Sequence, residues 1–382
     1  MLKKKWEQLR KQKSVIVTTL VVLFFIVLFF RPLLASFSFL YDLTLNTSID
    51  LKKEKDGTIN ILLLGIGGGT HEGPELTDTI IFTNINIEKK TVNLISIPRD
   101  VWVPQLKEKI NKAYSNGQEK GKQGMLLAKA TAQEVLGQQI DYVVVLDFSG
   151  FTKLVDYLGG IDVNVLNTLD DYNYPLDGKE IDTCGKSLDE IEEFSATASA
   201  EIDFWNFYSC RYRHLHVDKG PVRMDGKTAL AFVRSRHAEG FEGTDFARSA
   251  RQQQVIAAIR QKVLSLGILL NPLKILGIYN ILSSNINTNI QTHEFDDFIK
   301  VAQKMQGAKI QNNVIDAGDD IQNRSGLLIH PDISKDQNFE WVLIPRIGDG
   351  KFEEIHEYVD CIIGENICKV GVNSIEKISK NN

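Results

Sequence analysis

Three short apolar runs between Asn60 and Val103 constrain the fold more than any other feature of this 382-residue chain. Each run is rich in β-branched residues and is bounded by turn-forming residues, a pattern typical of β-strands. Neighbouring strands joined by short connections tend to pack side by side. We therefore expect the glycine-rich turn Gly65–Gly69, the acid Asp78 and the cluster Pro98-Arg99-Asp100 to lie in a common region. The runs are Ile61–Leu64, Ile80–Ile85 and Val92–Ile97.

Helical and extended patterns alternate after these strands. Residues 124–136 carry apolar side chains at helical spacing and end at Gly137, which favours a helix C-cap. The alternation predicts an α/β fold with a mixed central sheet covered by helices. Residues 167–217 are less regular and indicate an insertion or a long lid. Further elements are expected over 140–146 (strand), 148–158 (helix), 161–165 (strand), 266–282 (helical, with a break at Asn271-Pro272), 293–305 and 352–363 (helices), and 341–345 (strand).

The N-terminus combines basic residues with a long apolar run. Residues 14–34 are predominantly apolar, close to the ~20 residues that span a bilayer. The basic residues at positions 1–13 favour a cytoplasmic N-terminus. This predicts a single-pass cell-membrane protein with a juxtamembrane spacer over 35–57 and the remainder outside the cytoplasm. The alternative is a signal peptide cleaved near Ala35, for which the apolar run is long.

Composition excludes two classes of protein. The net charge of −5 gives no bulk attraction to nucleic acid, so no nucleic-acid partner is expected. Four cysteines are few for a disulfide scaffold of this length. No Cys/His spacing resembles a zinc site. Outside the cytoplasm Cys184 can pair with Cys210, and Cys361 with Cys368, but the sequence leaves both pairings open.

A second basic cluster lies far along the chain from Arg99. Four arginines fall within eighteen residues of a chain with net negative charge. Guanidinium groups grip phosphate oxygens in a fork and stay charged, which favours a diphosphate ligand. The alternative is a solvated helix face with salt bridges to acids. The cluster consists of Arg234, Arg236, Arg248 and Arg251, followed by Gln252.

Local geometry suggests how this cluster is presented. Asp245 is the expected N-cap of a helix. Arg248, Arg251 and Gln252 are three and four residues apart, so they are expected on one helix face. Arg234 and Arg236 alternate on a segment expected to be extended, which would point them the same way.

Taken together, these segments resemble the LytR-CpsA-Psr family. The motifs occur in the family's order over about residues 60–263, and the ordered set is more specific than any one motif. The single N-terminal span also fits the family's usual architecture. The motifs are Ile61–Gly65 with Thr77-Asp78-Thr79, Ser96-Ile97-Pro98-Arg99-Asp100, Lys109-Ile110-Asn111 with Ala113-Tyr114, Asp147-Phe148 through Val155-Asp156 to Gly159-Gly160-Ile161-Asp162-Val163, Asp225-Gly226 with Ala229-Leu230, Arg234-Ser235-Arg236, and Asp245-Phe246-Ala247-Arg248 with Arg251-Gln252.

The resemblance implies an extracytoplasmic phosphotransferase. Such enzymes take a glycopolymer from a polyprenyl-pyrophosphate lipid carrier and attach it through a phosphodiester to peptidoglycan, usually with Mg²⁺. The implied fold is an α/β/α sandwich with a deep apolar pocket for the lipid, preceded here by the transmembrane helix. The catalytic domain is expected at residues 58–365, with its core at 60–263 and the insertion at about 167–217, followed by a tail over 366–382.

The resemblance and the residue chemistry together give each site residue an expected role. Asp78 is expected to bind Mg²⁺, which prefers oxygen ligands. Five arginines are expected to hold the diphosphate and stabilise the charge that develops on it. Gln252 adds a neutral hydrogen bond. Asp100 is expected to orient Arg99 or, alternatively, to act as a base on the attacking sugar hydroxyl. The arginines are Arg99, Arg234, Arg236, Arg248 and Arg251, of which the first three join Asp78 and Asp100 as catalytic candidates.

One departure from the family pattern keeps other functions open. Members commonly carry an aspartate just after the first strand, where Gly67 stands here. His71 or Glu72 could replace it as a ligand, or the metal could be held more weakly. The glycines could instead let backbone amides approach a phosphate. Two alternatives to the transferase follow. One is a hydrolase of lipid-linked pyrophosphate, and the other is a membrane-tethered binding or regulatory protein.

Overall fold

The computed structural model describes residues 48–52, 57–69, 73–197, 201–263, 265–269, 271–319, 324–333, 335–338, 340–364 and 367–378. The expected membrane anchor at 14–34 and the loop residues His71 and Glu72 lie outside this part of the chain. Within the described residues, no helix is long and apolar enough to cross a bilayer. In the part of the chain that the structure describes, residues 48–51 and 292–303 form a small unit and the other residues form a large unit.

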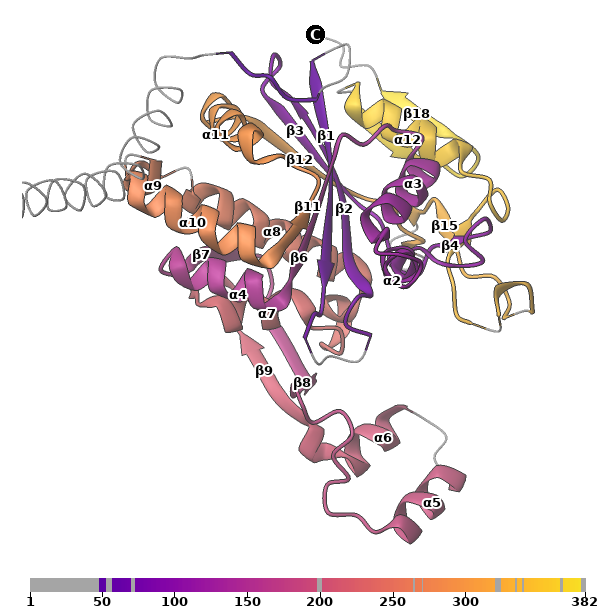
Figure 1. The fold of residues 1–382 in the computed structure, drawn as a ribbon. Coiled ribbons are helices and arrows are strands. Elements are labelled where there is room, and N and C mark those ends of the chain that lie inside the picture. Colours follow the sequence, from indigo (N-terminus) through magenta and orange to yellow (C-terminus); the bar gives the residue numbers. More distant parts are fainter. Residues whose placement is uncertain are drawn as a thin grey trace, which may run out of the picture. The chain divides into compact units, whose positions relative to one another are not determined.

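A six-stranded mixed sheet organises the large unit (Figure 1). β1 pairs antiparallel with β2 and parallel with β6, and β12 pairs parallel with β3. The three runs expected from the sequence form adjacent antiparallel strands, which confirms their expected packing. In spatial order the strands are β11 (Ile286–Thr288), β6 (Tyr142–Asp147), β1 (Thr58–Ile66), β2 (Thr77–Asn86), β3 (Thr91–Ser96) and β12 (Lys309–Val314).

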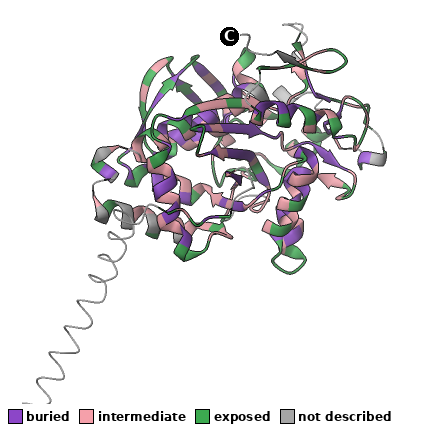
Figure 2. Cartoon of the chain, turned by 90° about the horizontal axis from the view of Figure 1, so that it is seen from above, coloured by how far each residue is buried: buried purple, intermediate pink, exposed green. Residues whose placement is uncertain are grey.

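Helices cover both faces of this sheet, with α3 and α12 on one side and α8 and α10 on the other in Figure 1. Leu62, Phe82 and Ile95 are fully buried cross-strand neighbours in one hydrophobic cluster with α3 and α12. Figure 2 shows the buried residues concentrated in the central strands. The helices are α2 (Ala113–Glu119), α3 (Gly124–Leu136), α4 (Phe148–Tyr157), α7 (Gly226–Arg234), α8 (Asp245–Val263), α9 (Leu266–Leu269), α10 (Pro272–Asn285) and α12 (Glu353–Ile363). The expected mixed sheet with flanking helices is therefore confirmed.

Local sequence signals placed several of these helices. α3 has the predicted bounds, and Gly137 ends it with a φ of 68°, a left-handed conformation that costs glycine little. In α4 the Asp147 carboxylate caps the helix by accepting from the Gly150 amide at 2.6 Å. Between α9 and α10, the predicted break falls at Asn271-Pro272.

Two expected strands lie outside the central sheet. β7 (Ile161–Val165) pairs with β10 (Gly220–Met224) in a separate ribbon. The expected strand 341–345 is shorter in the structure, where β16 (Ile344–Pro345) pairs with β15 (Leu328–Ile329). The preceding residue, Leu343, forms an isolated β-bridge with Val101. The remaining short pairs are β4 (Trp102–Val103) with β5 (Glu108–Lys109), β13 (Gly318–Asp319) with β14 (Arg324–Ser325), and β17 (Ile367–Val370) with β18 (Ile375–Ile378).

The less regular stretch after β7 forms an arm that we call the β8–β9 arm, residues 169–217. β8 (Leu169–Pro175) and β9 (Tyr212–Val217) pair antiparallel. The intervening residues carry α5 (Leu188–Thr197) and α6 (Glu201–Phe207), which lie beyond the end of the paired strands (Figure 1). Cys184 and Cys210 form a disulfide in this arm, and Cys361 of α12 forms a second one with Cys368 of β17. Both pairings that the sequence left open are thus present.

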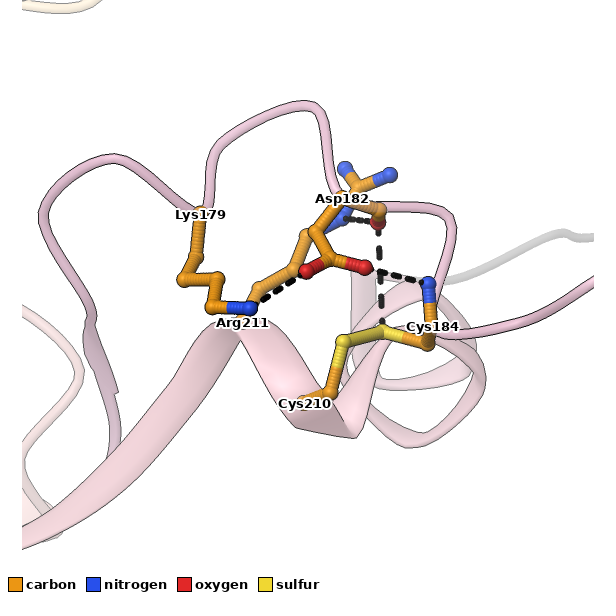
Figure 3. The surroundings of a disulfide bond; sticks show 5 residues. All are labelled: Lys179, Asp182, Cys184, Cys210 and Arg211. Atoms are coloured by element: carbon orange, nitrogen blue, oxygen red, sulfur yellow. Dashed lines mark hydrogen bonds and ion pairs between the residues drawn. A yellow bond between two sulfur atoms is a disulfide. The ribbon is translucent and has the colours of Figure 1, made fainter.

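Polar contacts support the arm's disulfide (Figure 3). The Asp182 carboxylate accepts from the Cys184 amide at 2.8 Å and pairs with Lys179 at 2.6 Å. The Asp182 carbonyl accepts from Arg211 Nε at 2.6 Å. These bonds and the disulfide fix the loop between β8 and α5 against the start of β9.

In the small unit, α11 (Phe295–Lys304) carries an ion-paired side-chain cluster. Lys300 lies 2.9 Å from Asp297 and 3.0 Å from Asp296. Asp297 also accepts from the Asp50 amide at 3.0 Å. Residues 48–51 are thereby held against α11.

Candidate functional site

The start of β2 and the segment after β3 lie next to each other and carry the first polar pair of the site. The two strands are antiparallel, and the Ile97 amide continues the ladder by donating to the Ile80 carbonyl at 2.9 Å. This register places Arg99 Nη1 2.5 Å from Asp78 Oδ1. The Asp78 side chain is 47% exposed, so solvent still reaches the carboxylate. The expected convergence of these two motifs is confirmed.

A cavity of about 240 Å³ opens beside this pair. Its lining is mixed, with apolar side chains from the sheet and from residues after β12, and with charges of both signs. Arg99 and Arg248 are its cationic residues, and Asp78 and Asp316 its anionic ones. The other lining residues are Thr79, Ile80, Ser96, Ile97, Pro98, Thr244, Ser249, Gln252, Val314, Ala317, Gly318, His330, Trp341 and Leu343.

Helix α8 supplies the second side of the cavity. Gln252 Nε2 donates to Thr79 Oγ1 at 3.0 Å, and Gln253 Nε2 lies 3.3 Å from Ser96 Oγ. These bonds hold α8 against β2 and β3, so Arg248 reaches the same cavity as Arg99. The N-cap is Thr244, whose hydroxyl accepts from the Ala247 amide at 3.2 Å, and not Asp245 as expected, which is the first helical residue.

Arg251 does not line the cavity, although its spacing suggested a shared face with Arg248. Its side chain is 2% exposed. It donates to the carbonyls of Phe232, Ser235 and Glu242 at 2.9, 2.7 and 2.7 Å, and it pairs with the Glu242 carboxylate at 2.8 Å. Burial lowers its pKa, and the Glu242 carboxylate opposes that shift. The expected phosphate contact by Arg251 is therefore wrong: this side chain ties α7, η3 (Gly240–Gly243) and α8 together.

The other two expected phosphate ligands lie outside the cavity lining. Arg234 is the last residue of α7, so the segment is helical here and not extended as expected. Its guanidinium lies over the Phe148 ring at 4.4 Å and pairs with Asp177 at 3.0 Å. Arg236 is exposed. The structure therefore divides the arginines: Arg99 and Arg248 share the cavity, and Arg234 lies beside the start of α4.

Asp100 lies behind Arg99 in a chain of ion pairs. It is 4% exposed, 3.5 Å from Arg99 Nε and 3.2 Å from Lys109 Nζ. Lys109 continues to Glu340 at 3.3 Å, and Lys112 binds the same carboxylate at 2.8 Å. Of the two roles expected for Asp100, this geometry favours orienting Arg99, because the carboxylate is already engaged by Arg99 and Lys109 and does not line the cavity.

The Glu340 contacts predict an acid-side loss of stability. The Lys112 ammonium, with Lys109 beside it, holds the Glu340 pKa below its ordinary 4.5. A depressed carboxyl pKa contributes stability that is present above 4.5 and lost as the pH falls through the folded-state pKa. We expect wild type to exceed Glu340→Gln in urea resistance at neutral pH, with the difference closing in acid. Glu119→Gln, at an exposed carboxyl, is the control; a constant Glu340→Gln difference at all pH values would contradict the assignment.

The glycine-rich turn has a structural reason of its own. Gly68 has a φ of 67°, and a Cβ there would lie 2.8 Å from Asp147 Cβ, so only glycine fits. Its amide donates to the Pro74 carbonyl at 2.8 Å. That amide is occupied, so the expected approach of a phosphate to the glycine amides gains no support at Gly68.

Asp78 is the carboxylate best placed to hold a metal ion with a bound substrate. Within the described part of the chain, it belongs to no cluster of three metal-ligating side chains. Mg²⁺ usually keeps several waters and binds through one or two carboxylates together with substrate phosphates. One exposed carboxylate beside a cavity that Arg99 and Arg248 also line fits that mode. It does not fit an all-protein metal cage.

Several cavity residues come from beyond residue 263, where the recognised motifs end. Asp316 pairs with Arg324 through both oxygens, at 2.6 and 3.0 Å. The His330 ring lies 4.2 Å from that of Trp341, which is 49% exposed. For these cavity residues the local sequence gave one signal, which is that Trp341 is the first residue of an expected strand. The loop positions of Asp316 and His330 carry no periodic pattern.

Comparison with known proteins gives a consistent picture. The model of the LytR_cpsA_psr family matches residues 41–338, which is more than half of the chain. The polyisoprenyl-teichoic acid–peptidoglycan teichoic acid transferase TagV of Bacillus subtilis is 29% identical over 256 residues, covering 65% of this chain and 53% of TagV. The regulatory protein MsrR of Staphylococcus aureus is 30% identical over 242 residues, covering 62% of this chain and 58% of MsrR. The match therefore spans about half the length of these relatives.

The crystal structure of B. subtilis TagV has the same fold. It superposes with a TM-score of 0.53 at 23% sequence identity, covering 81% of this chain and 99% of that one. At this identity the likeness concerns the fold alone.

Proposed function

The chain belongs to the LytR-CpsA-Psr family, and from that premise we propose that it is a phosphotransferase. Its substrate is a glycopolymer on a polyprenyl-pyrophosphate carrier, and its acceptor is peptidoglycan. The observation that carries the proposal is the cavity in which Arg99 and Arg248, from distant parts of the sequence, lie beside Asp78 and Gln252. Relatives named as teichoic acid transferases support this assignment.

The chemistry is a displacement at phosphorus. The acceptor hydroxyl oxygen forms a new P–O bond at the phosphate that bears the glycopolymer. The P–O bond to the bridging oxygen breaks, the hydroxyl proton is released, and polyprenyl phosphate leaves with the bonding electrons. Arg99 and Arg248 hold the diphosphate oxygens and stabilise the negative charge that grows on them. Gln252 donates a neutral hydrogen bond.

Asp78 would hold a Mg²⁺ ion in this arrangement. When bound, the ion neutralises phosphate charge and orients the oxygens. Asp100 acts through Arg99 as a positioning residue. Arg234 and Arg236 are assigned to the outer part of the bound substrate, since neither lines the cavity that Arg99 lines.

We place the catalytic domain outside the cytoplasm, anchored by residues 14–34. The basic residues before this run and its length support the anchor. The two disulfides support an oxidising compartment.

An acceptor-dependence assay tests the function. The full chain is incubated with a polyprenyl-pyrophosphate-linked glycopolymer and Mg²⁺, with and without a peptidoglycan fragment. We expect the phosphodiester product only with acceptor, and loss of product with a chelator that excess Mg²⁺ reverses. Glycopolymer phosphate released equally without acceptor would identify a hydrolase instead. Donor binding without turnover, unchanged in Asp78→Ala, would leave the binding or regulatory alternative.

A further inference from the structure

The base of the β8–β9 arm carries a cluster of metal-ligating side chains that the transferase site does not use. His214 and His216 alternate along β9, and Leu215 between them is buried, so both imidazoles lie on the exposed face. In the β8–β9 register Asp170 is the direct partner of His216. Two imidazoles and one carboxylate therefore share one face of a two-stranded ribbon.

The ligand atoms of these three residues are close enough for one ion. Asp170 Oδ1 lies 2.9 Å from His214 Nε2 and 2.7 Å from His216 Nδ1. One ligand atom from each residue lies within 4.8 Å of the others. Ligands at the usual 2.0–2.2 Å from a tetrahedral zinc ion are about 3.4 Å apart. The side chains are partly exposed, and small torsional adjustments satisfy that spacing.

We propose that Asp170, His214 and His216 bind one divalent transition-metal ion of the Zn²⁺ type. Two imidazole nitrogens and one carboxylate oxygen form a ligand set that Zn²⁺ and similar transition-metal ions prefer. Mg²⁺ and Ca²⁺ prefer ligand sets made of oxygen atoms alone. Three protein ligands leave the fourth position to water or to an oxygen of a bound molecule.

The surroundings orient the imidazoles as an outer shell orients metal ligands. His216 Nε2, the nitrogen opposite the ligating Nδ1, lies 3.2 Å from the Asp218 carboxylate. A carboxylate on the second nitrogen fixes the ring and its tautomer. Tyr172 stacks on His214 with ring centroids 4.1 Å apart and planes within 2°. Both rings are thus restrained before an ion arrives.

The site lies where the arm joins the segment that carries Arg234 and Arg236. The Asp170 carbonyl accepts from the Glu239 amide at 2.9 Å. The next residue, Asp171, is fully buried and accepts from Ser235 Oγ at 2.6 Å. An ion joining β8 to β9 here would stiffen the base of the arm against that segment. This inference does not depend on the proposed function.

Zinc titration of the full, tag-free chain tests the proposal. Calorimetry is run at slightly alkaline pH, because metal ligands bind in their deprotonated form, and in excess Mg²⁺, which fills sites made of oxygen ligands. We expect one Zn²⁺ per chain. His214→Ala and His216→Ala should each lose more affinity than the about 10- to 100-fold that outer-shell changes cost, and Asp218→Asn should fall within that range. Co²⁺ should give the visible absorption bands of a tetrahedral nitrogen–oxygen site.

His293→Ala is the matched control, since His293 is an exposed histidine on a different unit of the chain. It should bind Zn²⁺ as wild type does. If the wild-type protein binds no Zn²⁺ under these conditions, the proposal is overturned. Equal binding by wild type, His214→Ala and His216→Ala would also overturn it. Circular dichroism of each variant separates loss of the site from loss of the fold.

Discussion

Replacing Arg99 with alanine is expected to lower the turnover number of glycopolymer transfer by about 100- to 1,000-fold, the usual effect of removing one preorganised donor to a developing oxyanion. Arg99 reaches the cavity from the end of β3, where Asp78 and Asp100 bracket its guanidinium. The negative charge that grows on the diphosphate during transfer would lose one of the two guanidinium groups in the cavity lining. Donor binding should weaken less than turnover, because Arg248 still holds the phosphates.

Single-turnover kinetics with lipid-linked donor and acceptor measure this effect. Arg99→Lys is expected to recover part of the rate, since it restores the charge but not the forked geometry. Arg223→Ala is the matched control, because Arg223 pairs with Asp162 on the solvent-facing side of the β7–β10 ribbon and has no place in the proposed site. Turnover by Arg99→Ala equal to that of Arg223→Ala would remove Arg99 from the mechanism.

Arg251→Ala is expected to destabilise the large unit by about 3–5 kcal/mol, the usual cost of breaking a buried charge pair. Arg251 fills four hydrogen-bonding roles at once, to three carbonyls and one carboxylate. Its removal leaves the Glu242 carboxylate, which is 14% exposed, without its cation. The carbonyls of Phe232 and Ser235 lose their donors as well, and unpaired buried acceptors are costly.

Urea denaturation of the full chain gives the free energy of unfolding for this test. The double variant Arg251→Ala/Glu242→Gln should recover part of the lost stability, because it also removes the unpaired negative charge of Glu242. Arg223→Ala should stay within about 0.5 kcal/mol of wild type, as surface changes usually do. An effect of Arg251→Ala no larger than that of Arg223→Ala would contradict the structural role assigned to this arginine.

Arg248 and Arg251 show the limit of a prediction from residue spacing along a helix. At about 100° per residue, steps of three and four from Arg248 lead to opposite sides of it, so Arg251 and Gln252 diverge by about 100° around α8. The sequence placed all three on one broad face. The elements packed around α8 determine which of these side chains reaches the cavity. β2 contacts the side of α8 that carries Gln252, and α7 and η3 contact the side that carries Arg251.

The sequence by itself determined four strands of the central sheet (β1, β2, β3 and β6), the bounds of α3, the break before α10 and the family. Each of these depends on periodicity, turn chemistry or ordered motifs, all of which are written in adjacent residues. Only the tertiary structure decided which of the five expected arginines line the cavity. Arg99 and Arg248 line the same cavity, whereas Arg251 is buried and binds other parts of the protein. Asp316 and His330, which follow the family motifs in the sequence, also line the cavity. Side-chain partners across more than a hundred residues depend on strand register and helix docking, which no local pattern encodes.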